Sequence, residues 1–331
     1  NLSKKILIWY DNNQRRLPWR ISKKSKKKQY YRLISEFMLQ QTQVKTVIPY
    51  FNNFIKKIPN LRALSKSKQK DVLKLWEGLG YYRRAKNLHK TSKILIKNYK
   101  SKIPDKFDEI KKLPGIGEYT ANILLALIYN QQRIGIDGNV KRVFLRLYNK
   151  NLEKNNNTFN KKLIESFSNS RNGDMAEALM EFGAIICKPK NPQCNICTLK
   201  LKCYFFNKGN INFHKQNRQI QEKKYNIYCY LKKQKKQIAL KRNKSLSFLK
   251  NFYIPKIQLA NNNKNKKISK WIYLCSYNNN ISNIKMNIKL FYKFINTKPR
   301  NFKWYYIDKP GNEFIPSFTK KIFSKVIKVY K

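Results

Sequence analysis

The sequence predicts a mainly α chain of two domains, a helical domain followed by a smaller α+β domain. Its 331 residues are enough for about two domains of ordinary size. Over 1–208, apolar side chains recur at steps of three and four, the spacing of amphipathic helices, and proline and glycine separate the runs. After Cys203, short runs rich in aromatic and β-branched residues take over, which is typical of strands.

The first long helical pattern is the run Tyr31–Phe54, which we predict as one amphipathic helix. Glu36, Gln40 and Gln43 fall on another face of that helix, where a cleft could use them. Further helices are predicted at 81–99, 118–129, 138–149, 158–169 and 174–186.

A polar stretch, 209–223, is nearly free of large apolar residues and is predicted to be a linker. The domain that follows, 224–331, should be a small mixed sheet closed by a helix near 316–330. Asn261–Asn265 and Asn278–Asn280 are predicted as breaks between strands. The predicted strands are Tyr225–Leu231, Gln237–Leu240, Phe252–Ile254, Trp271–Tyr277, Ile288–Ile295 and Trp304–Ile307.

The charge of the chain is extreme, with 73 Lys and Arg against 17 Asp and Glu and a net charge of +56. Such a balance points to a polyanionic partner, and nucleic acid is the leading candidate. The favoured residues are also those of A/T-rich codons, so base composition accounts for part of the lysine count. No stretch of 18 apolar residues exists and Asn1–Tyr10 lacks a signal-peptide layout, so neither a membrane partner nor secretion is expected.

Four of the six cysteines lie within seventeen residues, with the spacing C-x6-C-x2-C-x5-C: Cys187, Cys194, Cys197 and Cys203. Four such thiolates suit a tetrahedral zinc ion or a [4Fe–4S] cluster, and disulfides are the weaker alternative. A single short C-x2-C hook favours the cluster, because zinc sites more often use two. Cys229 and Cys275 fall in predicted strands and should be core thiols.

A short glycine motif, Leu113–Gly117, lies between two predicted helices. Gly115 and Gly117 let backbone N–H groups turn outward beside a helix start, which makes an anion site. An ordinary helix–helix turn is the alternative. Followed by Glu118 and an apolar helix, the pattern predicts a helix–hairpin–helix at about 106–129 that contacts DNA phosphates without reading sequence.

Two acids stand inside otherwise apolar or glycine-marked motifs. Glu36 could be a first-turn helix acid and Asp137 an N-cap, and spacing alone favours those interpretations. Beside a DNA-binding hairpin and a thiolate cluster, they also suggest paired carboxylates flanking a glycosidic bond. One would protonate the leaving group and the other would stabilise an oxocarbenium-like centre.

With these motifs the chain resembles adenine DNA glycosylases of the MutY type, in the endonuclease III-like superfamily. The resemblance covers nearly all of 1–208 and is faint beyond it. It implies a helix–hairpin–helix glycosylase domain with a [4Fe–4S] loop at 187–203 and a Nudix-like second domain, here without a Nudix box. The motifs are LPWR at 17–20, SEFMLQQTQVKTVIPYF at 35–51, LWEGLGYYRRAKNLHK at 75–90, LPGIGEYTAN at 113–122, IDGNVKRV at 136–143 and EALMEFGAIIC at 177–187.

The resemblance also implies roles for individual residues. Glu36 would protonate adenine, Asp137 would stabilise the cationic sugar, Asn139 would orient groups around it and Tyr119 would assist. Lys141 could react slowly with an abasic product. The positions matching the pocket for an extruded adenine are Trp19, Arg20, Leu39, Val44 and Glu177. Those matching the plug or wedge in the opened stack are Gln41, Leu79 and Tyr81.

The sequence departs from the family in two places. A lysine-rich run, 22–28, is inserted and should be a solvated loop, with an extra phosphate contact as the alternative. The family recognises 8-oxoguanine through a loop with a Phe-Ser-His signature. The corresponding region, taken as Met286–Tyr292, has neither His nor Ser.

Taken together, these features predict excision of adenine mispaired with 8-oxoguanine or guanine in double-stranded DNA. Strand-cutting relatives carry a lysine where this chain has Tyr119, so a monofunctional hydrolase is expected. We also expect a monomer with one [4Fe–4S] cluster, cytoplasmic and associated with a bacterial nucleoid. The alternatives are a pyrimidine-lesion glycosylase and lyase of the same superfamily, and a non-catalytic basic DNA-binding remnant.

Overall fold

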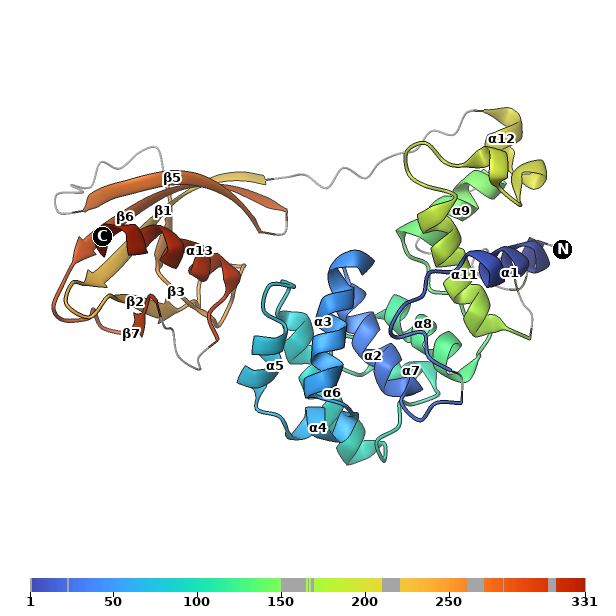
Figure 1. The fold of residues 1–331 in the computed structure, drawn as a ribbon, viewed down its shortest axis with the longest axis horizontal. Coiled ribbons are helices and arrows are strands. Elements are labelled where there is room, and N and C mark those ends of the chain that lie inside the picture. The colour runs from blue at the N-terminus through green and yellow to red at the C-terminus, as the bar shows by residue number, and fades with distance from the viewer. Residues whose placement is uncertain are drawn as a thin grey trace. The chain divides into compact units, whose positions relative to one another are not determined.

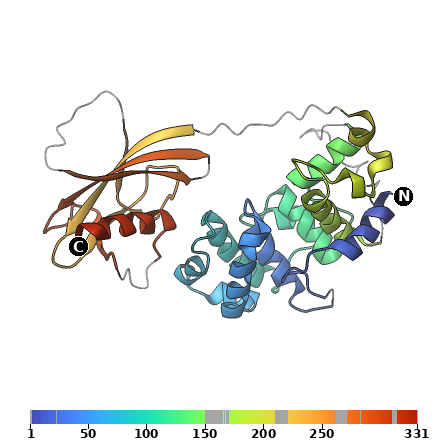
Figure 2. The same cartoon turned by 45° about the horizontal axis from the view of Figure 1, so that its top comes forward.

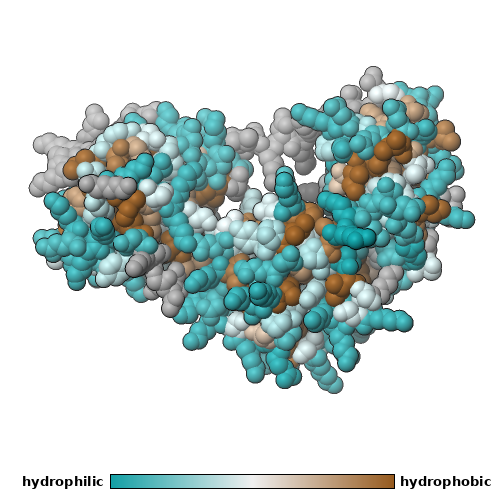
Figure 3. Space-filling view, viewed as in Figure 1, coloured by the Kyte–Doolittle hydropathy of each residue, from teal (hydrophilic) through white to brown (hydrophobic). Residues whose placement is uncertain are grey.

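A computed structural model describes residues 2–22, 24–149, 165, 167, 170–209, 221–260, 271–281, 283–308 and 314–330. The chain divides into two compact units, Asn1–Phe213 and His214–Lys331 (Figure 1). The first strand of the second unit begins at Gln221, inside the predicted linker, and residues 210–220 of that linker lie outside the described residues. Hydrophilic residues cover much of the visible surface of both units (Figure 3).

The first unit is helical, as predicted. Its helix predicted at 158–169 falls almost wholly outside the described residues. No helix in the described ranges is long and apolar enough to cross a membrane. Its elements are α1 (Leu2–Asn13), α2 (Lys28–Leu39), α3 (Val44–Lys57), α4 (Leu61–Lys66), α5 (Gln69–Leu75), α6 (Arg83–Asn98), α7 (Phe107–Lys111), α8 (Glu118–Tyr129), α9 (Gly138–Tyr148), α11 (Asn172–Ile185), α12 (Tyr204–Lys208) and the 3₁₀ turns η1 (Cys194–Ile196) and η2 (Lys200–Lys202).

The prediction of one helix over Tyr31–Phe54 is wrong, because α2 ends at Leu39 and α3 begins at Val44. Between them Gln41 adopts a left-handed backbone with φ 59°, which a continuous α-helix does not contain. The apolar spacing runs on across this turn, so periodicity alone does not reveal it. The break turns the chain toward the glycine hairpin, where the Gln40 side-chain amide donates to the Gly115 carbonyl at 3.1 Å.

Close packing of α9 against α11 forms the core nearest the predicted site. Phe144 and Phe182 are fully buried there, and Trp9 of α1 packs edge-on against Phe182 with ring centroids 5.0 Å apart. A Cβ at Gly183 of α11 would lie 2.7 Å from the Cβ of Asn139 and 3.0 Å from its carbonyl oxygen. The absence of a side chain at Gly183 therefore sets how near the start of α9 comes to α11.

The second unit is a mixed sheet with one helix, α13 (Ser317–Val326), and a final 3₁₀ turn, η3 (Ile327–Tyr330). The strand order is β3-β2-β1-β6-β5, with β4 beside β1 and β7 beside β2. Only β1 and β6 are parallel among the described pairs. The strands are β1 (Gln221–Lys232), β2 (Gln237–Arg242), β3 (Tyr253–Ile254), β4 (Lys256–Leu259), β5 (Ile272–Ile281), β6 (Ile284–Phe294) and β7 (Phe302–Tyr306).

Three details of this unit differ from the sequence predictions. Strand β4 was not predicted. The predicted break Asn278–Asn280 lies within β5, where Asn278 pairs with Asn287 of β6. The region Met286–Tyr292, taken as the recognition loop, is the middle of β6 and buries alternate residues in the core. The connection from β5 to β6 is instead the short segment after Ile281 and before Ile284, and Asn261–Asn265 lies outside the described residues.

We expect Gly183→Ala to destabilise the first unit by about 1–3 kcal/mol, because the new methyl group overlaps Asn139. At a solvent-exposed position inside a helix, replacing glycine by alanine would instead increase the stability of the protein. Thermal unfolding of the parent protein and of the variant measures this loss of stability. Gly138→Ala is the matched control, since a Cβ there meets no atom within 4 Å. Equal melting temperatures for the two variants would contradict the close packing of α9 and α11.

Candidate active site

The glycine hairpin joins α7 to α8 at the surface of the first unit. Gly115 has φ +84°, and a Cβ there would lie 2.8 Å from both Asn87 and Phe37, so only glycine fits. The Thr91 hydroxyl fixes the turn by donating to the Pro114 carbonyl at 2.9 Å. Gly117 is the N-cap of α8, is exposed and offers no side-chain cap. The start of α8 can therefore present backbone N–H groups to an anion such as a phosphate.

Glu36, on the last turn of α2, is a buried carboxyl with 6% of its surface exposed. Burial raises its pKa to about 8, because an ionised carboxylate loses its water there. Arg32 opposes this rise, while the negative charges of Glu177 and Asp137 add to it. Glu36 is thus protonated at neutral pH and can act as a general acid.

Asp137 is the N-cap of α9, and its Oδ1 accepts from the Val140 backbone N–H at 2.7 Å. Its Oδ2 accepts from the side-chain amide of Asn139 at 2.9 Å. Burial raises the pKa of Asp137, and these two hydrogen bonds oppose the rise by favouring the carboxylate. The N-cap interpretation is therefore correct, and the same cap fixes the carboxylate near Glu36.

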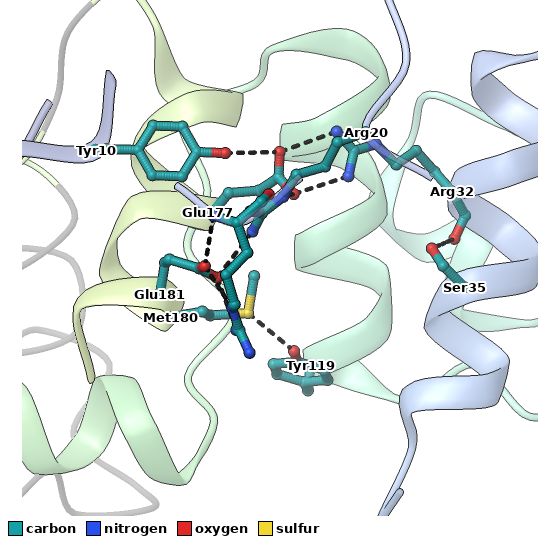
Figure 4. A network of polar contacts seen from close by, with 9 residues as sticks. Tyr10, Arg20, Arg32, Ser35, Tyr119, Glu177, Met180 and Glu181 are labelled. Atoms are coloured by element: carbon teal, nitrogen blue, oxygen red, sulfur yellow. Dashed lines mark hydrogen bonds and ion pairs between the residues drawn. The ribbon is translucent and has the colours of Figure 1, made fainter. Parts of the chain in front are cut away.

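Three of the predicted catalytic residues come together from three different helices. Tyr119 lies in the first turn of α8, and its hydroxyl donates to the Met180 sulfur at 3.3 Å (Figure 4). Burial raises its pKa, and the carboxylates of Glu36 and Asp137 raise it further. The pKa of Glu36 thus responds to Asp137, about a hundred positions away in the sequence. The fold brings both acids and a phenol to one partly buried place.

A buried network of ion pairs surrounds Glu177 (Figure 4). Arg32 binds both carboxylate oxygens of Glu177, at 2.8 and 2.9 Å, and Arg20 binds one of them at 2.8 Å. Although burial raises the pKa of Glu177, the two arginines bring it below its usual range. The Tyr10 hydroxyl donates to the same carboxylate at 3.3 Å, and Arg20 also reaches Glu181 at 3.1 Å.

In this network, Arg20 and Glu177 join the segment after α1 to α11 through a buried ion pair. Sequence reasoning identified both of them but missed Arg32, which is four positions before Glu36 on the same helix. Nothing in the sequence marks Arg32, because it is one of 73 basic residues. Because Glu177 is ionised, it disfavours a second negative charge at Glu36.

A second missed residue, Arg142 of α9, connects the acid site to the cysteine loop. Its guanidinium donates to the Asn139 side-chain oxygen at 2.8 Å and to the Cys187 carbonyl at 2.7 Å. It also donates to the Gly183 carbonyl at 2.6 Å. Asn139 in turn holds Asp137, so Arg142 positions the carboxylate through one intermediate side chain.

Arg84 of α6 joins the two loops that carry the predicted wedge residues. Its guanidinium donates to the carbonyls of Met38 and Gln40 at 2.6 Å each, and to the Gly80 carbonyl at 3.2 Å. It also lies 5.4 Å from the ring centre of Tyr81. A buried arginine thus fixes both loops relative to one another.

The remaining predicted residues occupy different environments around these loops. Gln41 and Tyr81 are exposed and have left-handed backbones, with φ 59° and 46°. Such conformations are strained for residues other than glycine and are frequent at functional sites. Leu79 and Trp19 are buried, Leu39 and Val44 are half-buried, and Lys141 is exposed.

The four clustered cysteines are half-buried at the end of the first unit. Burial raises the pKa of the Cys197 thiol to about 11, and the other three thiols add to this rise. Backbone N–H groups of Leu199 and Phe206 donate to Cys197 and Cys203, which favours thiolates. The Arg146 guanidinium lies 3.4 Å from the Cys187 sulfur.

The four thiols form a donor set of sulfur alone, which is the set used by structural zinc sites and by iron–sulfur clusters. In the described residues, no three His, Cys, Asp or Glu side chains stand close enough to hold one metal ion. The thiolates of a cubane stand farther apart than those of a tetrahedral zinc, because each binds a different iron.

Residues 34–168 match the HhH-GPD superfamily of base excision DNA repair proteins. Among solved structures, a thermostable thymine-DNA glycosylase has a TM-score of 0.57 and 26% identity, over 62% of this chain and 95% of that one. A trapped endonuclease III–DNA covalent intermediate has a TM-score of 0.52 and 22% identity, over 62% and 94%. The first unit therefore has the endonuclease III-like, helix–hairpin–helix fold.

Relatives with a known activity define the family more narrowly. The adenine DNA glycosylase of Buchnera aphidicola subsp. Baizongia pistaciae (strain Bp) is 38% identical over 344 residues, which cover 98% of this chain and 96% of that protein. The adenine DNA glycosylase of Homo sapiens is 33% identical over 207 residues, which cover 60% of this chain and 38% of that protein. The chain belongs to the adenine DNA glycosylase family.

We expect Glu36→Gln to stabilise the protein near pH 8 and to change its stability little near about pH 5. The protonated carboxyl favours folding, and this contribution is lost as pH rises toward its folded pKa of about 8, because the unfolded chain gives up the proton at lower pH. Glutamine is neutral at both pH values, so the variant should gain about 3–4 kcal/mol relative to the parent between about pH 5 and pH 8.

Thermal unfolding of parent and variant at the two pH values tests this expectation. Asp108→Asn removes an exposed acid of α7 and is the control, which should show no such dependence on pH. A Glu36→Gln effect of the same size at both pH values would show that the carboxyl is not held neutral by burial.

Proposed function

We propose that this chain is a monofunctional DNA glycosylase that hydrolyses the N-glycosidic bond of adenine mispaired with 8-oxoguanine or guanine in duplex DNA. The observation that carries the proposal is a buried Glu36 with a pKa of about 8 beside Asp137. A protonated acid and a hydrogen-bonded carboxylate in one site are what cleavage of a glycosidic bond requires.

In the proposed reaction, Glu36 donates its proton to the adenine ring as the C1′–N9 bond breaks, and the bonding electron pair leaves with the base. The sugar becomes an oxocarbenium-like cation, which the Asp137 carboxylate stabilises. A water oxygen then bonds to C1′, and the proton it releases restores the Glu36 carboxyl. No base, sugar or enzyme atom changes oxidation state.

The hydrogen bonds on Asp137 support its part in this reaction. Asn139 and the Val140 N–H fix both carboxylate oxygens, so little reorganisation is needed as charge develops on the sugar. Arg142 fixes Asn139 in turn. We therefore assign Asn139 and Arg142 as positioning residues, and Tyr119 as a contact on the side of the site nearest Met180.

Hydrolysis rather than strand cleavage is supported by the residue at 119. A lyase needs an amine to form a Schiff base with the sugar, and the phenol of Tyr119 cannot supply one. Lys141 carries an amine but is exposed on α9. A lyase of the same superfamily is thus the weaker proposal, and a non-catalytic remnant would not need a raised pKa at Glu36.

The adenine must leave the base stack to reach these buried acids. The exposed, strained Gln41 and Tyr81 are suited to occupy the opened stack, and Arg84 holds their loops together. The half-buried Leu39 and Val44 flank the turn that carries Gln41 and can line the base pocket. Phosphate contacts are assigned to Gly115, Gly117 and the start of α8.

We infer that the turn between β5 and β6 contacts the opposite base, in place of the family's Phe-Ser-His loop. In the sequence, Ile281, Ser282 and Asn283 follow the order of an apolar residue, a serine and a polar residue. Ser282 lies outside the described residues, and Asn283 is exposed. An amide at Asn283 can donate and accept hydrogen bonds, as an imidazole can.

We further propose that the protein acts as a monomer on chromosomal DNA of a bacterial nucleoid. The net charge of +56 and the bacterial relatives support this. If the protein binds many phosphates, its affinity for DNA should fall steeply as the salt concentration rises. Sedimentation in solution tests whether the protein is a monomer.

The proposal is tested by single-turnover incubation with duplexes that contain adenine opposite 8-oxoguanine or guanine, followed by alkali. We expect strand breaks only after alkali, no covalent adduct with borohydride, and a rate that falls as pH rises through about 8. Glu36→Gln should lower the rate by at least about 100-fold, and Asp108→Asn should not change it.

Intact strands with the parent protein, at a level unchanged by Glu36→Gln, would contradict the assigned function. A borohydride adduct would favour the lyase instead. In the same assay, Asn283→Ala should reduce the preference for 8-oxoguanine over guanine and leave the guanine rate unchanged. Loss of both rates equally would argue against contact between this turn and the opposite base.

We propose that Cys187, Cys194, Cys197 and Cys203 hold one [4Fe–4S] cluster. When bound, the cluster would fix the loop that follows α11. Arg142 donates both to the Cys187 carbonyl in this loop and to the Asn139 side chain, so a fixed loop would also hold Asn139 in place. We expect the purified protein to absorb in the visible range and to contain about four irons per chain.

Cys194→Ser should lose iron and absorption, and Cys275→Ser, at a half-buried thiol of β5, is the control that should keep both. A purified protein that contains one zinc per chain and does not absorb in the visible range would contradict this proposal. It would show that the four cysteines hold a single ion.

A further inference from the structure

One face of the sheet in the second unit has no described helix on it. Helix α13 packs on the face that carries Ile227 and Leu290, and in Figure 2 it lies on one side of the sheet only. Side chains of paired residues point to the same side of a sheet. Tyr228 pairs with Phe291 and with Lys256, so these three share the opposite face, here called the outer face.

Aromatic rings form a continuous row across the outer face. Tyr273 of β5 pairs with Phe291 of β6, and their ring centroids are 5.8 Å apart. Phe291 is stacked on Tyr228 of β1 at 5.5 Å. Trp271 contacts both Tyr228 and its neighbour Tyr230, at 4.9 Å each. The row therefore crosses three strands without interruption.

The row continues toward β7 and carries lysines along its length. Tyr230 contacts Phe302 of β7 at 5.6 Å, and Trp304 lies two residues further along the same strand. Lysine ammonium groups lie over three of these rings at 5.6–5.9 Å. The pairs are Lys256 over Tyr228, Lys241 over Phe302 and Lys232 over Trp304.

Acidic residues are almost absent from this part of the sequence. Over 214–331 they are Glu222, Asp308 and Glu313. Glu222 is near the start of β1 and is bound by Lys285 at 2.5 Å. The rings of the outer face thus lie in a strongly positive part of the sequence, and among the described residues no carboxylate is paired with the lysines over these rings.

We propose that the outer face is a binding platform for single-stranded DNA. The exposed Tyr273 and the half-buried rings of the row can stack on bases of any sequence, while the buried Tyr228 and Phe302 support them from below. The interleaved lysines meet the phosphates between those bases. Sheet faces with exposed aromatic residues bind single strands in this way in other folds. A duplex hides its base planes and cannot use the rings, and an apolar protein partner would leave the lysines buried without counter-charges.

Tryptophan fluorescence locates such binding within the full chain. Trp271 and Trp304 are half-buried on the outer face, whereas Trp9, Trp19 and Trp76 are buried in the first unit. A thymidine oligonucleotide of about 15 residues, which contains no adenine to excise, should quench the emission in a saturable way. The double variant Trp271→Phe and Trp304→Phe should abolish this quenching, and a duplex of equal length should not produce it.

A pair of neighbouring residues provides the matched affinity test. Tyr273 and Ile272 are equally exposed, at 53% and 52%, but face opposite sides of the sheet. Tyr273→Ala should weaken binding of the oligonucleotide about tenfold, and Ile272→Ala should leave it unchanged. Neither change should alter adenine excision from a duplex, so this inference and the proposed glycosylase activity can fail separately.

Three outcomes would overturn the proposal. The first is quenching that survives replacement of both tryptophans. The second is equal affinity of the Tyr273→Ala and Ile272→Ala variants. The third is dimerisation through this face. In that case the parent protein would have the mass of a dimer in solution, Tyr273→Ala would halve that mass, and the oligonucleotide would not change it.

Discussion

The buried pairing of Arg32 with Glu177 is the interaction on which the first unit most depends. It ties α2 to α11, and Arg20 brings the segment that follows α1 to the same carboxylate. Removing charged groups from water is costly, and the bidentate geometry with extra donors offsets that cost. The same negative charge helps to keep a proton on Glu36. One ion pair thus acts on both the fold and the chemistry of the site.

The fold was predictable where a pattern is local. Helices α6, α8, α9 and α11 follow directly from apolar spacing between proline and glycine. The turn after Leu39 was not predictable in that way, because apolar side chains keep their spacing on both sides of it. Asn278–Asn280 is unfavourable for a strand by composition, yet pairing with β6 makes it one. Long-range pairing decided these cases, and a single sequence does not display it.

The site was predictable in part for a related reason. An acid is conspicuous in a chain with 17 acids among 73 bases, so Glu36 and Asp137 stood out. Arg32, Arg84 and Arg142 carried no such signal, because one basic residue among many is not distinctive. Only the contacts of each guanidinium reveal that it fixes a carboxylate or a loop. The electrostatic partners of the acids therefore had to come from the structure.

The buried arginines also limit how far this composition can change. Arg32, Arg84 and Arg146 are at most 7% exposed, and no lysine in the described ranges is buried to that degree. In an A/T-rich genome, one guanine-to-adenine substitution in an AGA codon replaces arginine by lysine. On the surface such a replacement preserves charge and solvation. Inside, a single ammonium cannot reach the several carbonyl and carboxylate oxygens that a planar guanidinium spans. Mutational pressure can therefore enrich lysine on the surface of the protein, while the buried positions keep arginine.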